Sequence, residues 1–320
     1  MADTRLFFAT DVHGNSVCWQ KFLKMPEIHN VNVMVLGGDL TGKAIVPIVR
    51  QKDNTYIYDL FRKKHELRDL KAVEKAAEDI SGITGYYTLI TSPEEMAMLE
   101  RDQVKLREIF ENLQKERLRK WMALADEKLK GDVKNVRIFA SGGNDDTPAI
   151  NSILKESKSV TYCEDRVVDV DAYHKMISLS WVNPSPWNTP REASEEQLEE
   201  MYAKLFAQVS NYENLICNFH APPFDSGLDT APKLDKTLKP EIGMFGIEAE
   251  PVGSKATRKA IEKYQPLLGL HGHIHESSGE RKIGRTLCVN PGSEYGEKIL
   301  RGYIFDLTPE GISKHWRVYG

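Results

Sequence analysis

Seven residues of types that bind metal ions follow short apolar runs of the chain. They are Asp11, His13, Asp39, Asn144, His220, His273 and His275. Carboxylate, amide and imidazole donors without a thiolate suit Mn, Fe or Zn ions. Seven ligands are too many for one four-coordinate ion, so we expect two divalent ions that share a bridging ligand. Such a pair turns a bound water into hydroxide near neutral pH and stabilises charge at phosphorus, which predicts hydrolysis of phosphoester bonds.

Each motif taken alone has a plainer interpretation. A single His13 or His220 is commonly a hydrogen-bonded core histidine, and Asp39 and Asn144 also suit turns. The Gly-His-x-His pattern at 272–275 is rarer than an Asp-x-His pattern. In open α/β folds, ligands bind beyond the carboxyl ends of strands. The prediction of a metal site therefore depends on five such ends carrying ligand types together.

The apolar runs before these residues have the length and the β-branched and aromatic content of buried strands. They cover residues 6–9, 31–36, 136–140, 175–182, 215–219 and 266–270. Helical spacing occurs at 16–23, 192–209 and 255–264, and further strands are expected at 286–289, 300–307 and 311–318. This alternation predicts an α/β fold, largely one domain over residues 1–320, with a β-sandwich flanked by helices.

Residues 43–134 interrupt this pattern and form an expected insertion. Runs at 43–50 and 55–58 flank the turn-like pair Asp53-Asn54, which predicts a hairpin. Apolar residues at helical spacing then predict two amphipathic helices. The first would contain Leu60, Leu67, Leu70, Val73, Ala77 and Ile80, and the second, starting at Pro93, would contain Leu99, Leu106, Phe110, Leu113, Trp121 and Leu124. The insertion either packs on the body or forms a cap or dimerisation arm over the site.

Composition excludes some classes of function. A net charge of -4 gives no electrostatic footprint for bulk nucleic-acid binding. No apolar run approaches the roughly 20 residues that a membrane span needs, and the start is too short and too acidic for a signal peptide. The four cysteines are scattered and form no C-x-x-C pair, which fits a reducing compartment. We therefore expect a cytoplasmic protein with no membrane contact.

In this order the ligand blocks resemble the calcineurin-like metallophosphoesterase superfamily. Its pattern is D-x-H, G-D, G-N-H-[DE], a single H and G-H-x-H, and four of these five blocks are intact here. The runs at 143–146, 270–276 and 289–293 are similar to Icc-related prokaryotic phosphoesterases. The resemblance spans residues 6 to about 302 apart from the insertion. It implies a four-layer α/β/β/α sandwich.

The resemblance also implies how the ligands divide between the ions. Asp11, His13 and His275 would bind the first ion, Asn144, His220 and His273 the second, and Asp39 would bridge them. This arrangement would give a dinuclear centre of Mn or Fe/Zn type.

One block departs from the family pattern, because Asp145 stands where the family has a histidine. That histidine is assigned to protonating the leaving group or contacting the phosphate. Asp145 could donate a proton only if its pKa rose from about 3.9, whereas nearby cations favour the carboxylate. The favoured alternative is that Asp145 or Asp146 orients a metal ligand. Superfamily members without this histidine resemble phosphodiesterases more than strong monoesterases.

Further residues concern the substrate. Trp187 and Arg191 lie in a Pro-rich loop and could stack on and grip a substrate, or the loop could simply lead into a capped helix. His271 is expected to face away from the ligand pair. We expect a phosphoesterase, preferring diesters, that acts on a small or nucleotide-like phosphoester. A nuclease of the same superfamily and a metal-binding protein-interaction scaffold are the alternatives, and the insertion could mediate homo-oligomers.

Overall fold

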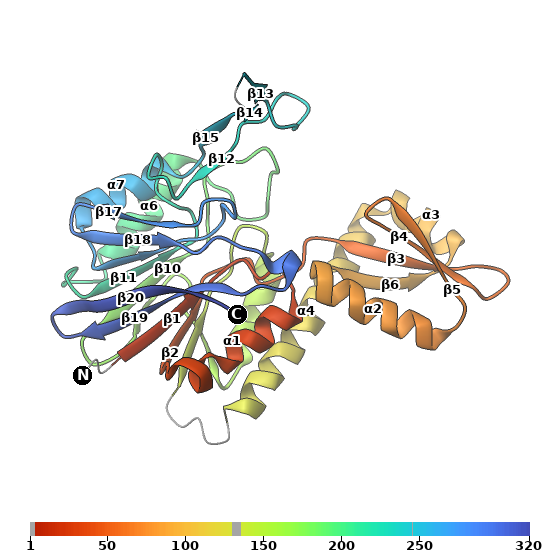
Figure 1. Cartoon of the computed structure of the whole chain (residues 1–320), viewed down its shortest axis with the longest axis horizontal. Helices are drawn as coiled ribbons and strands as arrows, with labels where there is room; N and C mark the ends of the chain where they lie inside the picture. The colour runs from red at the N-terminus through yellow and green to blue at the C-terminus, as the bar shows by residue number, and fades with distance from the viewer. Residues whose placement is uncertain (1–3, 130–135, 245) are drawn as a thin grey trace.

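The computed structural model describes residues 4–129, 136–244 and 246–320 (Figure 1). The predicted end of the insertion, at about residue 134, lies outside the described residues. Two six-stranded sheets form the body of the molecule. Among the described residues, no helix combines the length and the apolar character needed to cross a lipid bilayer.

The first sheet is built around the N-terminal strand. Its order is β20 (Gly311–Tyr319), β19 (Arg301–Thr308), β1 (Thr4–Ala9), β2 (Val33–Leu36), β7 (Arg137–Ala140) and β8 (Val160–Tyr162). The last four strands run parallel, while β19 pairs antiparallel with both β1 and β20. Because β1, β2 and β7 run parallel, their carboxyl ends lie side by side at the same end of the sheet.

The second sheet also has four neighbouring parallel strands. Its order is β17 (Gly279–Ile283), β18 (Thr286–Asn290), β16 (Leu268–Leu270), β11 (Leu215–Phe219), β10 (Lys175–Leu179) and β9 (Val167–Asp169). The four inner strands are parallel, and the two edge strands are antiparallel to their neighbours. The carboxyl ends of β11 and β16 therefore also lie side by side.

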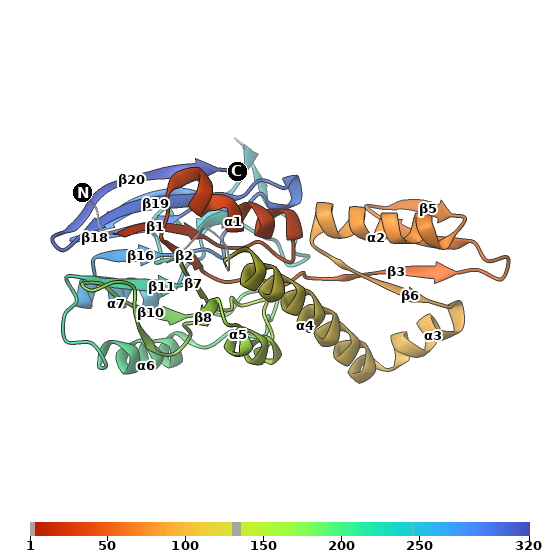
Figure 2. The same ribbon diagram turned by 90° about the horizontal axis from the view of Figure 1, so that it is seen from below.

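The two sheets pack face to face, and helices cover their outer faces (Figure 2). Leu6 and Phe8 of β1 point into the core between the sheets, while Phe7 and Ala9 pack against helices. The helices on the first sheet are α1 (Ser16–His29), α4 (Gln103–Lys128) and α5 (Asn151–Glu156), and those on the second are α6 (Glu195–Phe206) and α7 (Lys255–Tyr264). A strand buried on both faces explains its unbroken apolar sequence. The predicted α/β architecture is confirmed.

The insertion projects from one end of the body and contains a sheet as well as helices (Figure 1). Its four strands have the order β5 (Lys63–Leu67), β4 (Tyr56–Leu60), β3 (Ile45–Arg50) and β6 (Tyr87–Thr91), and its helices are α2 (Leu70–Thr84) and α3 (Pro93–Arg101). The predicted hairpin is present, since β3 and β4 pair antiparallel. The prediction that Leu60 and Leu67 lie on a helix is wrong, because both belong to the β4–β5 hairpin.

Helix starts in the insertion follow local capping chemistry. Ser92 and Glu95 form a reciprocal capping box at the start of α3, which confirms the predicted start at Pro93. The second predicted helix is divided at Asp102, whose side chain accepts from the backbone N–H of Lys105 and caps α4.

A separate arm after His220 consists of β12 (Thr230–Pro232), β13 (Ile242–Gly243), β14 (Gly246–Ile247) and β15 (Ala249–Pro251).

Candidate metal centre

The seven predicted ligands lie together where the two sheets meet. Those of the first sheet follow β1, β2 and β7, and those of the second follow β11 and β16. Two groups of ligand atoms form, each with all atoms within 4.8 Å of one another. One group is Asp11, His13, Asp39 and His275, and the other is Asp39, His220 and His273. Asp39 belongs to both.

Asn144 completes the second group through its side-chain oxygen. Its Oδ1 lies 3.1 Å from Nε2 of His220. Its amide nitrogen donates to Oγ1 of Thr189 at 3.1 Å and to Oδ1 of Asp145 at 3.2 Å, so the oxygen is turned toward the histidines. The structure thus brings all seven predicted residues together, while their division between two ions stays a prediction.

The spacing of the donor atoms fits a metal ion. Nε2 of His13 and Nε2 of His275 face each other at 2.9 Å. With metal–nitrogen bonds of about 2.0–2.1 Å, two nitrogens at right angles on one ion lie about 2.9 Å apart. Nε2 of His275 is also 3.3 Å from Oδ1 of Asp11.

Four of the ligand residues have a left-handed backbone. The φ angles are 55° at Asp11, 41° at His13, 48° at Asp39 and 67° at His273. This conformation costs a non-glycine residue roughly 1–2 kcal/mol and persists where the surroundings impose it. Here the loops after β1 and β2 bond to each other, from the N–H of Asp11 to the carbonyl of Gly38 and from that of His13 to the carbonyl of Asp39. Strain concentrated in this way is typical of a functional site.

Two glycines leave room for the ligand carboxylates. A Cβ at Gly143 would lie 2.2 Å from Oδ1 of Asp39, and one at Gly272 would lie 2.3 Å from Oδ2 of Asp11. Both distances are far below van der Waals contact, so any side chain would displace the carboxylate.

The protonation states also suit cation binding. Burial lowers the pKa of His13 well below its ordinary value and that of His273 to about 4, so both are neutral. Burial alone would raise the pKa of Asp11 and Asp39. His220 and His275 together outweigh it at Asp11, and His220, His13 and Lys43 together outweigh it at Asp39, so the pKa of each falls below its ordinary value and both stay ionised. Neutral imidazole and carboxylate are the forms that bind metals.

His220 shows where positive charge is favoured. Burial lowers its pKa, yet Asp39 and Asp11 outweigh this effect and raise the pKa to about 9. Its Nε2 is 3.4 Å from Oδ2 of Asp39 and 3.8 Å from Oδ1 of Asp11. The carboxylates of Asp11 and Asp39 stabilise the positive charge of protonated His220. The same two carboxylates would stabilise a cation bound between them.

Asp145 lies beside the first group of ligands. Its Oδ2 is 3.7 Å from Nδ1 of His13 and 2.8 Å from Nζ of Lys43, and its backbone N–H donates to Oδ1 of Asp39. Burial and the charge of Asp39 raise the pKa of Asp145 to about 6, although Lys43 opposes this. The lower pKa expected beside two bound cations concerns the loaded site and stays a prediction.

Asp146 ties the ligand loops together. Its buried carboxylate accepts from the backbone N–H groups of Leu40, Thr41 and Gly143, each at 2.9 Å. These bonds fix the loop that contains Asp39 against the loop that contains Asn144, so Asp146 positions ligands from outside the coordination shell.

Arg191 does not face a substrate. It is only 2% exposed, and its guanidinium donates to the carbonyl of Asp146 at 2.7 Å, to Oγ of Ser180 at 2.8 Å and to Oδ1 of Asn151 at 2.9 Å. The suggestion that it grips the substrate is therefore not supported, because its donors are used inside the protein. Trp187 is 60% exposed, and its contact with substrate stays a prediction.

Two residues near the ligand cluster, Lys43 and Tyr295, belong to no motif from which the sequence could have predicted them as site residues. Lys43 reaches Asp145 from the first residue of the insertion. The ring of Tyr295 packs 4.7 Å from the ring of His13 and 5.9 Å, edge to face, from that of His275. His271, by contrast, turns Nδ1 to the carbonyl of Phe219 at 2.8 Å, as expected for a structural histidine.

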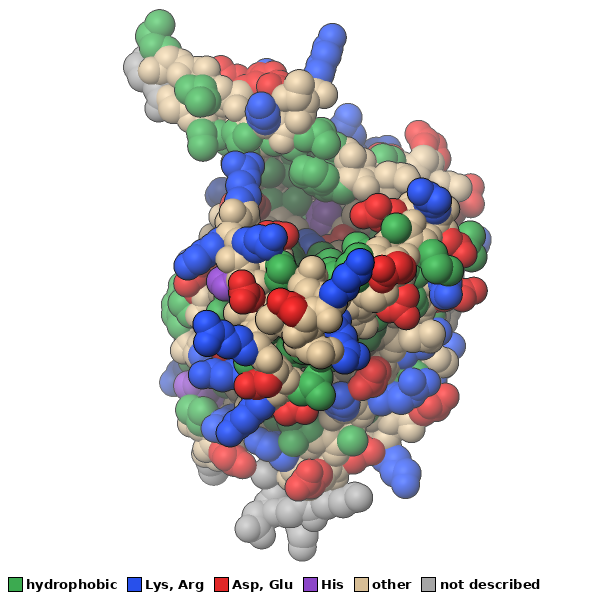
Figure 3. Space-filling view, turned by 90° about the vertical axis from the view of Figure 1, so that its right-hand side faces the viewer, with side chains coloured by type: hydrophobic (Ala, Val, Ile, Leu, Met, Phe, Trp, Pro, Cys, Tyr) green, Lys and Arg blue, Asp and Glu red, His purple; other side chains and the backbone are tan. Residues whose placement is uncertain are grey.

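The face of the molecule on the insertion's side is mixed in charge. Figure 3 shows acidic and basic side chains interspersed on the face seen from the insertion's side, with a hollow beneath the β12–β15 arm that contains apolar side chains and a histidine. No continuous basic groove of the kind that tracks a phosphate backbone is visible on this face.

Comparisons place the chain among known proteins. No protein-family model matches it. The uncharacterized protein MJ1162 of Methanocaldococcus jannaschii is 34% identical over 158 residues, which make up 49% of this chain and 64% of that protein. The match therefore spans less than two thirds of that relative's length.

Solved structures show the shared fold. The crystal structure of TT1561 of Thermus thermophilus aligns with 99% of this chain and 98% of that one at a TM-score of 0.54 and 12% identity. A novel archaeal phosphodiesterase aligns with 99% of this chain and 100% of its own at 12% identity, but with a TM-score of 0.37. Phosphoesterases are thus among the structural neighbours, at a similarity too low for further argument.

Proposed function

We propose that this chain is a metal-dependent phosphoesterase with a dinuclear centre of Mn or Fe/Zn type and a preference for phosphodiesters. The observation that carries this proposal is Asp39, whose carboxylate belongs to both groups of ligand atoms. The packing of two sheets with helices on both outer faces supports the proposed four-layer sandwich of the calcineurin-like metallophosphoesterases. The Icc-related type is supported by the runs at 143–146, 270–276 and 289–293.

In this proposal Asp11, His13 and His275 would hold one ion, Asn144, His220 and His273 would hold the other, and Asp39 would be shared by both. When bound, two such ions activate water as a nucleophile and stabilise charge on the phosphoryl oxygens.

The protein supplies orientation around this centre. Asp146 fixes the loops that carry Asp39 and Asn144, and Thr189 orients the amide of Asn144. Lys43 places an ammonium group beside Asp145, at the position where the family has a histidine. Burial lowers the pKa of Lys43, but the carboxylates of Asp145 and Asp39 outweigh it and raise that pKa, so the group keeps its positive charge. A fixed cation there can contact a phosphoryl oxygen without acting as an acid.

The test uses a chromogenic pair, bis(p-nitrophenyl) phosphate and p-nitrophenyl phosphate, with Mn²⁺, Zn²⁺, Fe²⁺ and Mg²⁺ in turn. We expect metal-dependent turnover of the diester, reduced at least about 100-fold in Asp39→Asn, because that change removes a ligand of both ions. Asp59→Asn, an exposed aspartate on β4, is the matched control and should keep full activity. Protein that contains two ions by elemental analysis and hydrolyses neither substrate would refute the proposal.

A further inference from the structure

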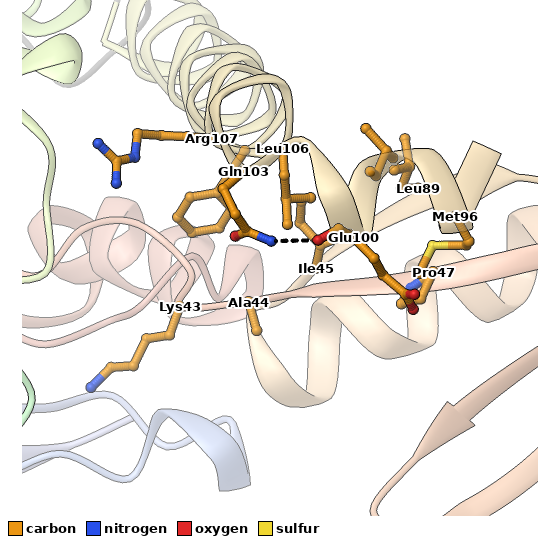
Figure 4. A pocket seen from close by; sticks show the side chains of 12 residues that line it. Lys43, Ala44, Ile45, Pro47, Leu89, Met96, Glu100, Gln103, Leu106 and Arg107 are labelled. Atoms are coloured by element: carbon orange, nitrogen blue, oxygen red, sulfur yellow. Dashed lines mark hydrogen bonds between the residues drawn. The ribbon is translucent and has the colours of Figure 1, made fainter.

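A cavity of about 420 Å³ lies in the insertion, between its sheet and helices α3 and α4 (Figure 4). This volume falls within the range of about 300–1,000 Å³ for small-molecule sites. The side chains that line its apolar part are Ile45, Pro47, Leu89, Met96, Leu106 and Phe110. All six remain partly accessible.

The pleat of β3 explains why these side chains are available. Val46 and Ile48 point to one face of the sheet and are buried against α2. Ile45 and Pro47 point to the opposite face and line the cavity. The insertion therefore has a conventional core on one side of its sheet and a hollow apolar surface on the other.

One end of the cavity approaches the proposed metal ligands through Lys43. Lys43 lines the cavity with its aliphatic stem, and its ammonium group lies 2.8 Å from Oδ2 of Asp145. That carboxylate oxygen is 3.7 Å from Nδ1 of His13, so only two contacts separate the cavity wall from a metal ligand.

A second cation stands at the same end. Figure 4 shows Lys43 and Arg107 extending from the cavity toward the same side, where the ribbons of the body lie, while Leu89 and Met96 lie at the other end. Arg107 is exposed, and its guanidinium forms no hydrogen bond or ion pair with another described residue. An apolar cavity with two cations at the end nearest the metal ligands is complementary to an amphiphilic anion.

Hydrogen bonds hold the insertion in a fixed position relative to the ligand loops. Arg117 of α4 donates to the carbonyls of Gly14 at 2.6 Å and Gly85 at 3.0 Å, and Gln114 donates to Oγ1 of Thr41 at 3.0 Å. These bonds join the insertion to the loops that contain His13 and Asp39, so a substrate could contact both places at a defined distance.

We propose that this cavity binds the apolar alkyl or aryl group of a phosphoester whose phosphate lies at the metal centre beside Lys43 and Arg107. This inference rests on the proposed function and narrows its substrate class to amphiphilic phosphoesters.

The first test is a series of alkyl p-nitrophenyl phosphate diesters, from methyl to octyl. We expect kcat/KM to rise roughly threefold to fourfold per added methylene until the cavity is filled, because each methylene leaves water. Met96→Trp should abolish this dependence by filling the cavity. Met98→Trp is the matched control on the same helix, since Met98 is 62% exposed and lines no part of the cavity, and it should behave as the unaltered protein.

A binding measurement separates this inference from the proposed activity. Calorimetric titration with octyl phosphate and with inorganic phosphate should show tighter binding of octyl phosphate, lost in Met96→Trp on α3 and in Leu106→Trp on α4. Such binding without any hydrolysis would support the cavity and refute the phosphoesterase. Hydrolysis with equal kcat/KM for methyl and octyl esters, or equal binding of the two phosphates, would overturn the inference even if the enzyme is active.

Discussion

Glu164 is a buried carboxyl group whose charge the fold tolerates poorly. Its Oε1 accepts from the N–H of Ser180 at 2.8 Å and from its Oγ at 2.6 Å, while Oε2 is buried with no hydrogen-bond partner among the described residues. Burial raises the pKa of Glu164 from 4.5 to about 7, although Arg191 opposes the shift. Replacement by glutamine keeps the shape and removes the ionisation.

The sign and size of the effect follow from linkage. Between pH 4.5 and 7 the folded protein binds more protons at Glu164 than the unfolded chain does, so the free energy of unfolding falls as pH rises through this window. With 1.36 kcal/mol per pKa unit, this group alone lowers stability by about 2 to 3 kcal/mol between pH 5 and pH 8. Glu164→Gln lacks this loss, so its stability relative to the unaltered protein should increase by that amount over the same range.

Urea unfolding of both proteins at pH 5 and pH 8, with the same metal content, measures this difference. Asp171→Asn provides a control of opposite sign. Burial raises the pKa of Asp171, but hydrogen bonds from Thr4, Tyr173 and His174 outweigh it and lower that pKa. The native protein should therefore exceed this variant in stability at neutral pH and lose the advantage in acid. If Glu164→Gln changed the free energy of unfolding by the same amount at pH 5 and pH 8, the pKa of Glu164 would not be raised in the folded protein. That result would refute the prediction.

Three further outcomes follow. Arg117→Met leaves the carbonyls of Gly14 and Gly85 without their donor, so we expect a loss of about 2 to 4 kcal/mol in urea unfolding; an unchanged midpoint would contradict it. Trp187→Ala should change stability by less than about 0.5 kcal/mol because the side chain is 60% exposed, and only a raised KM would mark it as a substrate contact. Chelation of the metal should lower Tm in calorimetry, since free ion at about 100 times Kd contributes roughly 2.7 kcal/mol; a Tm indifferent to chelator and to added Mn²⁺ would argue against a metal site.

The ligand set could be predicted from the sequence because every ligand lies within five residues of the end of a strand. Runs such as Leu6-Phe-Phe-Ala9 and Val33-Met-Val-Leu36 are buried on both faces, so their apolar composition marks strands without ambiguity. The turn that follows each one then carries the polar residue to the edge of the sheet.

The insertion was harder to predict for a physical reason. Lys63–Leu67 is a polar edge strand with exposed side chains, and its structure depends on pairing with β4. Leu60 and Leu67 are spaced as on a helix, and only the register of the hairpin distinguishes the alternatives. Tertiary pairing overrides local periodicity in such a segment.

Lys43 and Arg191 show the same limit at the site. Lys43 follows Asp39 by four residues and reaches Asp145, whereas Arg191 is distant from every ligand in the sequence and is buried beneath the loop of Asp146. The role of each cation depends on which loops pack around it. This packing is a property of the whole fold and cannot be predicted from the local sequence.

The sharing of one site between distant parts of the chain has a consequence for biosynthesis. His13 and His275 face each other across 262 residues of sequence. At about 5–20 residues per second on the ribosome, roughly 13 to 52 seconds separate the synthesis of these two side chains. Throughout that interval Asp11, His13 and Asp39 lack His275, and β1 lacks its neighbour β19. The proposed first group of ligands is therefore completed late in synthesis, because a nascent chain that stops before residue 275 lacks one of its four members.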